Sequence, residues 1–106
     1  MPKNSRMKGK VGELEAAKLL QEHGFEARRG QQFAGGPDSG DLKHNVPFVH
    51  FEVKRTEKLR LYPALDQATN DAAEGFDPVV LHRQNKREWV VIMRADVFLK
   101  LMKEFE

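Results

Sequence analysis

Apolar residues recur at the spacing of an α-helix in three stretches of the chain. The first two stretches end at Gly24 and Gly75, residues typical of the position after a helix, and Pro63 opens the second. In the third stretch apolar and charged residues separate onto two faces. We expect this apolar face to pack in the core, with a dimer contact as the alternative. The predicted helices cover residues 11–25, 63–75 and 95–105.

Five short runs rich in β-branched and aromatic residues predict strands. The last two, DPVVLHR and WVVIM, have the composition of central or near-central strands. The predicted strands cover residues 25–33, 40–44, 47–55, 77–83 and 89–93. Together with the helices they give the order αβββαββα. This order predicts an α/β fold in which one mixed five-stranded sheet is flanked by helices.

The size and composition of the chain fit one small domain over residues 1–106. Hydrophobic residues make up 40% and charged residues 32%, an ordinary balance for a globular domain. There is no cysteine, which excludes disulfides and thiolate metal sites. No apolar run approaches the about 20 residues of a membrane span, and the basic N-terminus lacks the apolar core of a secretory signal. We therefore expect a cytoplasmic protein without a membrane segment.

The net charge is only +2, but the basic residues are clustered. Residues 1–10 carry four basic side chains and no acid, and we expect them to form a flexible basic arm. Arg28 and Arg29 form a second cluster, and residues 83–87 a third. Such patches suit a polyanion such as nucleic acid, although a solvated tail and two solvated turns would look the same.

The run PFVHFEVKR combines a core pattern with charged residues. Because side chains alternate along a strand, Val49, Phe51 and Val53 share one face, while Glu52 and Lys54 share the other. His50 joins Glu52 on that face, and we interpret it as structural or polar support. A buried carboxylate and amine need partners or a metal ion. The alternative is an edge strand with a solvated face and ordinary ion pairs.

Two further carboxylates are candidates to meet Glu52. If the loop between the second and third strands has an even number of residues, Asp41 lies on the face of Glu52, whereas Asp38 in the preceding loop has the opposite parity. Glu13 lies in the middle of the apolar face of the first helix, which is unusual for an acid. Its alternative role is that of an acid favoured by the dipole near a helix N-terminus.

Carboxylates that converge beside a lysine have a clear chemistry. Hard oxygen ligands suit Mg²⁺, with Mn²⁺ as a substitute. Asp41 and Glu52 would hold the ion, with the carbonyl of Val53 nearby, and the ion would activate a water molecule for attack on a phosphodiester. Lys54 would hold or deprotonate that water, or neutralise the transition state.

These residues carry a resemblance to a known superfamily. Asp41, followed after ten residues by Glu52-Val53-Lys54, resembles the D…ExK signature of the PD-(D/E)xK nucleases. KGKVGELEAAKLLQEHGF is similar to the first helix of archaeal-type (Hjc-like) Holliday junction resolvases. The stretches RRGQQFAGGPDSGDL, FEVKRTEKLRLYPALDQA and PVVLHRQNKREWVVIM resemble small resolvase-like endonucleases of phages and prophages. The resemblance spans about residues 8–95, and Gly40 departs from the residue that many relatives have before the aspartate.

The resemblance implies a restriction-endonuclease-like core and a role for each matching residue. Glu13 would match an acid that helps to bind metal, often through water, and Asp41 and Glu52 would match the two direct ligands. Lys54 would match the catalytic lysine. Gln67 would match a glutamine placed beside the site, although a solvated helix position is the alternative.

The implied function is Mg²⁺-dependent, structure-selective cleavage of branched DNA by a homodimer, in a bacterial host and encoded by the bacterium or a phage. The alternatives are a nicking, flap or restriction-like nuclease of the same superfamily, or a non-catalytic DNA-binding subunit with the same fold. Sequence-independent phosphate contacts are expected from the clustered basic residues. These are Lys8, Lys10, Arg28, Arg29, Arg55, Lys58, Arg60, Arg83, Lys86 and Arg87.

Overall fold

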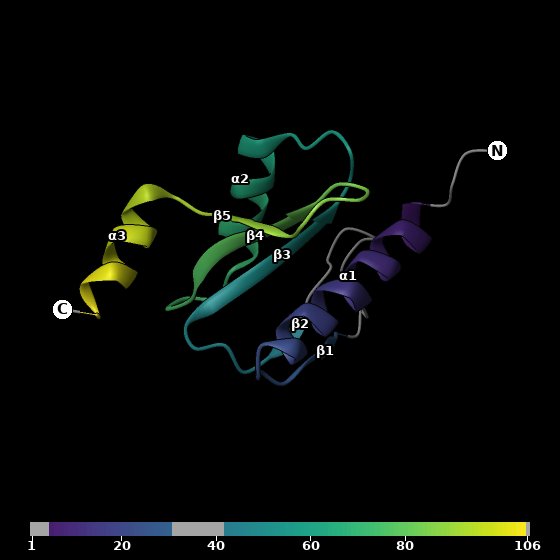
Figure 1. Cartoon of the computed structure of the whole chain (residues 1–106). Helices are drawn as coiled ribbons and strands as arrows, with labels where there is room; N and C mark the ends of the chain where they lie inside the picture. The colour runs from purple at the N-terminus through teal and green to yellow at the C-terminus, as the bar shows by residue number, and fades with distance from the viewer. Residues whose placement is uncertain (1–4, 31–41, 106) are drawn as a thin grey trace.

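The computed structural model describes residues 5–30 and 42–105, and for residues 5–8 the backbone alone. The elements follow the predicted order αβββαββα (Figure 1). The helices are α1 (Ser5–Glu22), α2 (Leu61–Asp71) and α3 (Ala95–Lys103). The strands are β1 (Ala27–Arg29), β2 (Leu42–His44), β3 (Val49–Arg55), β4 (Asp77–Arg83) and β5 (Val90–Ile92).

The five strands form two sheets, so the prediction of one five-stranded sheet is wrong. The three-stranded sheet has the order β3-β4-β5 and is mixed, since β3 is parallel to β4 and β4 is antiparallel to β5. β1 and β2 form a separate antiparallel pair. Asn45 ties the end of β2 to the start of β1, because its backbone N–H donates to the Glu26 carbonyl at 3.2 Å and its side chain accepts the Glu26 N–H at 2.9 Å. β2 is therefore held on β1 instead of on β3.

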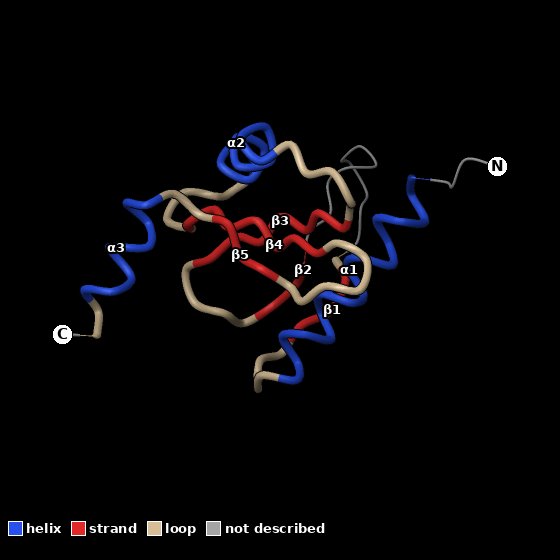
Figure 2. Tube along the Cα trace, turned by 45° about the horizontal axis from the view of Figure 1, so that its top comes forward, coloured by secondary structure: helices blue, strands red, loops and turns tan. Residues whose placement is uncertain are grey.

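Helices cover both faces of the three-stranded sheet (Figure 2). Odd-numbered strand residues, such as Phe51 and Leu81, pack with Ala16 and Leu20 of α1. Val80 packs on the opposite face with the buried residues of α2. Because β3 and β4 are parallel, α2 forms the crossover between them. The face of β3 that carries Glu52 and Lys54 therefore looks toward α2.

The helix boundaries differ from the prediction at both ends of α1 and of α2 and at the end of α3. α1 begins at Ser5, so residues 5–10 are helical and not part of a flexible arm. Gly24 has φ +91°, as expected for the residue that closes the helix. α2 begins at Leu61, so Pro63 is its third residue, and it ends at Asp71, before Gly75 with φ +89°. The extent of α2 depends more on the packing of Ala64, Leu65 and Ala68 against the sheet than on Pro63 and Gly75.

The C-terminal part of the chain is more exposed than its sequence predicts. β5 is an edge strand and not a central one, and its Val91 is 54% exposed. In α3 only Val97 is buried, whereas Phe98 and Met102 are exposed, as is Phe105 just after the helix. The prediction that the apolar face of this helix packs in the core is therefore wrong for most of its residues. Among the described residues, no helix combines the length and apolar character needed to cross a membrane.

Candidate metal centre

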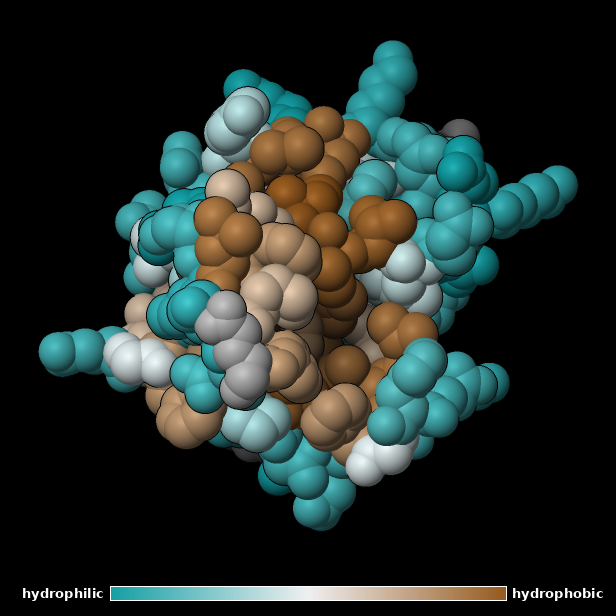
Figure 3. All heavy atoms as spheres, turned by 60° about the vertical axis from the view of Figure 1, so that its left-hand side comes forward, coloured by the Kyte–Doolittle hydropathy of each residue, from teal (hydrophilic) through white to brown (hydrophobic). Residues whose placement is uncertain are grey.

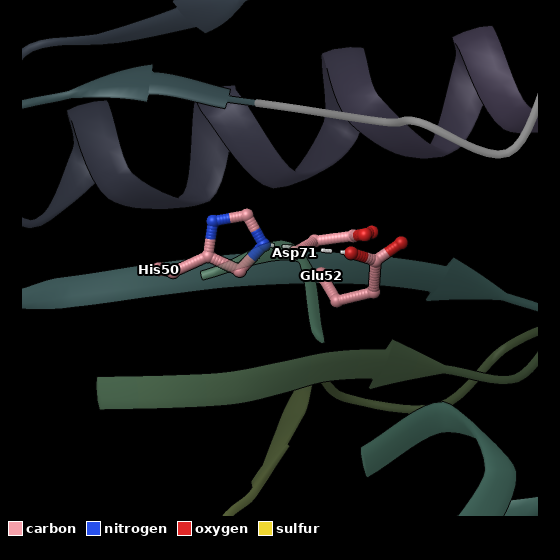
Figure 4. Close-up of side chains that lie close together, drawn as sticks. All are labelled: His50, Glu52 and Asp71. Carbon is pink, nitrogen blue, oxygen red and sulfur yellow. Dashed lines mark ion pairs between the residues drawn. The ribbon is translucent and has the colours of Figure 1, made fainter. Parts of the chain in front are cut away.

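His50, Glu52 and Asp71 form a group that could hold a metal ion. His50 and Glu52 alternate along β3 and so point to one side of it, and Asp71 is the last residue of α2 (Figure 4). One ligand atom from each residue lies within 4.8 Å of the others. The Nε2 atom of His50 and the Oε2 atom of Glu52 are 3.5 Å apart. Across residues 5–30 and 42–105, this is the group of three His, Asp or Glu side chains whose ligand atoms lie close enough together to hold one ion.

Glu52 is buried at an unusual electrostatic cost. Its side chain is 1% exposed, and its Oε2 atom accepts no hydrogen bond. Burial raises the pKa of the Glu52 carboxyl, and the nearby His50 and Lys54 offset part of that rise. A buried carboxylate oxygen without a donor is the position that a cation would satisfy. The donor set of two carboxylates and one imidazole fits Mn²⁺, and its oxygens also suit Mg²⁺.

Lys54 and Gln67 lie beside this group on the same faces of β3 and α2. The Nζ atom of Lys54 donates a hydrogen bond to the Oε1 atom of Gln67 at 2.6 Å. Gln67 and Asp71 are four residues apart in α2 and so share one side of the helix. The structure thus places Gln67 against Lys54 of the ExK strand, and its role beside a catalytic site stays a prediction.

A hollow of about 300 Å³ opens next to the metal group. Its lining includes His50 and Asp71 together with His44 and Phe76. Burial, and to a lesser extent the neighbouring His50, lowers the pKa of His44. The Nδ1 atom of His44 accepts the Val46 N–H at 3.1 Å, and its ring meets Phe51 edge to face at 4.8 Å. His44 is thus a neutral wall residue of the hollow at physiological pH.

Glu13 is buried in α1 as predicted, but the structure places it in a different environment from Glu52. Its Oε1 atom accepts a hydrogen bond from Arg29 Nε of β1 at 2.7 Å, and its side chain is 5% exposed. It does not belong to the described group that could hold an ion. Its predicted part in metal binding would require its carboxylate to share or leave the contact with Arg29.

Two predicted ligands have no described geometry at the site. Asp41 lies outside the described residues, next to Leu42, which is buried in the core with Val49 and Phe51. The side chain of Val53 packs against this same core, on the face opposite to Glu52. The metal contacts of Asp41 and of the Val53 carbonyl therefore stay predictions.

The predicted DNA-binding residues divide into two groups. Three arginines are held by acids of the fold: Arg29 by Glu13, and both Arg55 and Arg83 by Glu15, at 2.9 and 3.2 Å. The side chain of Lys8 lies outside the described part. The remaining cations are exposed, and these are Lys10, Arg28, Lys58, Arg60, Lys86 and Arg87. The exposed set is the better source of phosphate contacts, because the three other arginines are held by acids of the fold, whereas the pair of Arg87 with Glu88 lies on the surface.

Sequence reasoning missed Asp71 and undervalued His50. Asp71 stands in NDAAEG, a polar stretch that resembles a solvated helix end. Its spacing of four residues from Gln67 was the available signal, because it places both side chains over the same strand. The strand alternation places His50 on the face of Glu52, but it does not distinguish a metal ligand from a residue that gives structural or polar support.

A divalent ion is expected to stabilise the protein through this group. Mn²⁺ at about 100 times its dissociation constant adds about 2.7 kcal/mol, which corresponds to a rise of about 10 °C or more in Tm for a domain of this size. Asp71→Asn should weaken binding and reduce this rise. Asp66→Asn, at an exposed position of the same helix, is the matched control and should leave it unchanged. An unchanged Tm of the wild type with Mn²⁺ would contradict the assignment.

Comparisons with protein-family models, with curated proteins and with solved structures found no match to this chain.

Proposed function

We propose that the chain is a metal-dependent DNA endonuclease with a restriction-endonuclease-like core, which hydrolyses phosphodiester bonds in branched DNA as Holliday junction resolvases do. The observation that carries the proposal is the arrangement on one face of β3. There a buried Glu52 with an unsatisfied oxygen lies within 4.8 Å of His50 and Asp71, and Lys54 follows on the same face. The D…ExK spacing of the sequence supports the same chemistry.

Each side chain has a separate task in this proposal. Glu52, Asp71 and His50 would hold a divalent ion, and Asp41 is the further predicted ligand. When bound, such an ion lowers the pKa of a water molecule and neutralises charge on a phosphate. Lys54 carries a positive charge to the same face of the strand, where it would orient the water or stabilise the developing negative charge. The hydrogen bond from Lys54 to Gln67 keeps the ammonium group in place.

The exposed cations and the number of subunits bear on the substrate. Exposed lysines and arginines would bind phosphates without reading bases, so affinity should fall steeply with salt. One chain contributes one such centre, and symmetric cleavage of two strands at a junction needs two. The proposal therefore includes a homodimer with one centre in each copy.

A non-catalytic DNA-binding subunit is the second candidate, and the burial of Glu52 favours it. A carboxylate that is 1% exposed is reached by a phosphate only if neighbouring side chains move. Such a subunit would bind junction DNA without cleaving it under any metal condition.

Cleavage of a labelled four-way junction tests the proposal. With Mg²⁺ or Mn²⁺ we expect cuts near the branch point, and none with EDTA. A linear duplex and a flap with the same arm sequences serve as controls. Equal cleavage of the linear duplex would replace the resolvase assignment with a nicking or restriction-like nuclease. Binding without cleavage would support the second candidate, and neither binding nor cleavage would reject both.

A further inference from the structure

The outer edge of β5 is unprotected. In the order β3-β4-β5, only one edge of β5 is paired, and no other strand of residues 5–30 or 42–105 covers the second edge. The strand Val90–Ile92 contains no charge and no proline. Val90 is 43% exposed and Val91 is 54% exposed. Monomeric proteins usually block such an edge with a charge, a proline or a bulge, because it can pair with another strand.

Exposed apolar side chains of α3 continue this surface. Figure 3 shows the side of the molecule that carries α3, where apolar residues gather along a hollow with hydrophilic residues around it. The exposed large apolar residues here are Phe98, Leu99 and Met102 of α3, and Phe105 just after the helix. An amphipathic helix with this much uncovered apolar surface is typical of an interaction site.

The sequence of β5 and its flanks is complementary to itself. A two-fold axis through Val91 would set β5 antiparallel to the β5 of a second copy. In that register Val90 faces Ile92, and Trp89 faces Met93. Glu88 then faces Arg94, and symmetry forms this pair twice. Glu88 is 73% exposed and pairs with its neighbour Arg87, and Arg94 is 47% exposed and pairs with Asp96, so each would exchange a surface partner for the charge across the two-fold axis.

Neighbouring registers lack this complementarity. A shift that centres the axis on Ile92 brings Glu88 toward Asp96 in the first turn of α3, which are two acids, and leaves Arg94 opposite Val90. A shift that centres it on Val90 sets Lys86 opposite Arg94, which are two bases. Like charges directly opposite each other destabilise a strand pair. Charge therefore selects the register centred on Val91.

We propose that this surface binds a second copy of the chain. The two β5 strands pair antiparallel about Val91, which joins the two three-stranded sheets into one sheet of six strands. The register sets Ala95 opposite Arg87, so α3 of each copy begins beside the β4–β5 turn of the other copy. A two-fold contact of this kind is closed, so it ends at a dimer and does not continue into a fibre. The inference specifies the interface of the homodimer that the proposed function includes, but its evidence is this surface and it does not require nuclease activity.

Light scattering and sedimentation equilibrium of the free protein test the interface. The wild type should be a dimer. Arg94→Glu alone sets two carboxylates opposite each other at both ends of the junction, and Glu88→Arg alone sets two guanidinium groups there. Each single change should raise the dimer dissociation constant about tenfold or more. The double variant Glu88→Arg/Arg94→Glu restores both pairs with reversed sign and should return the constant to near the wild-type value.

Lys18→Glu makes a charge change of the same size as Arg94→Glu at an exposed position of α1, and it should leave the dimer intact. All three substituted positions are exposed, and circular dichroism verifies that the variants are folded. A monomeric wild type, single changes without effect, or a double variant that stays as weak as the single ones would each overturn the proposed interface. Mass and affinity are measured without DNA or metal, so these outcomes are independent of those of the cleavage assay.

Discussion

Glu52→Gln is expected to remove metal-dependent DNA cleavage while it makes the metal-free protein more stable. Loss of one charged ligand should lower the cleavage rate by about 10²- to 10³-fold or more. The same change removes a buried negative charge whose Oε2 atom accepts no hydrogen bond, and it should raise the free energy of unfolding by about 1–2 kcal/mol at neutral pH in EDTA. Cleavage rates and urea denaturation measure the two effects.

The stability gain of Glu52→Gln should depend on pH in one direction. Burial raises the pKa of Glu52 in the folded protein. The wild type is therefore destabilised where the unfolded chain is ionised, and this penalty grows as pH rises from the unfolded pKa through the folded pKa. Below the unfolded pKa the wild-type carboxyl is neutral in both states, and the difference from glutamine should vanish. Asp66→Asn, an exposed acid of α2, should show neither effect. A Glu52→Gln protein that cleaves DNA at the wild-type rate would contradict the assignment.

Gly12→Ala is expected to destabilise the fold by about 1–3 kcal/mol, although alanine is the better helix former. A Cβ atom at Gly12 would lie 2.6 Å from the Cβ and 3.3 Å from the Cγ of Arg55, closer than packed atoms approach. Arg55 cannot easily yield, because Glu15 and Asn85 each accept a hydrogen bond from its guanidinium group at 2.9 Å. The backbones of α1 and β3 would have to separate.

Gly9→Ala is the matched control for this substitution in the same helix. A Cβ at Gly9 meets no atom within 4 Å, so alanine should stabilise the protein by about 0.5–1 kcal/mol. The two variants should therefore shift the urea midpoint in opposite directions. If both variants shift it upward, the close approach of α1 to β3 at Gly12 is wrong.

Local patterns predicted the elements, because they depend on near neighbours in the chain. The alternation along PFVHFEVKR identified the buried and polar faces of β3, and the strand DPVVLHR appears with its predicted bounds. The apolar face of the first helix also identified Glu13 as a buried acid. In each case the period of the residues is itself the physical cause of the structure.

Features that depend on distant partners could not be predicted in the same way. The five runs indicate strands, but they do not indicate that β2 pairs with β1, a pair that the contacts of Asn45 with Glu26 extend. The apolar face of α3 indicates burial, but a helix can be buried only where the fold brings a partner to it. The sequence does not identify Asp71 as a possible ligand, because Asp71 comes close to Glu52 only through the way that α2 packs across the sheet. The resemblance implied that Gln67 lies beside the site, but it did not predict the hydrogen bond that Lys54 donates to Gln67.

The described part of the candidate centre lies wholly within one β3–α2–β4 unit, between residues 50 and 71 of the chain. Its five side chains are joined by a short loop and one helix, so little chain entropy is lost in bringing them together. The centre therefore depends on contacts that are local in the chain. Destabilising substitutions in α1 or α3 should lower the fraction of folded molecules. They should not change the metal affinity of the molecules that stay folded. Global stability and local site geometry are therefore separable properties of this chain.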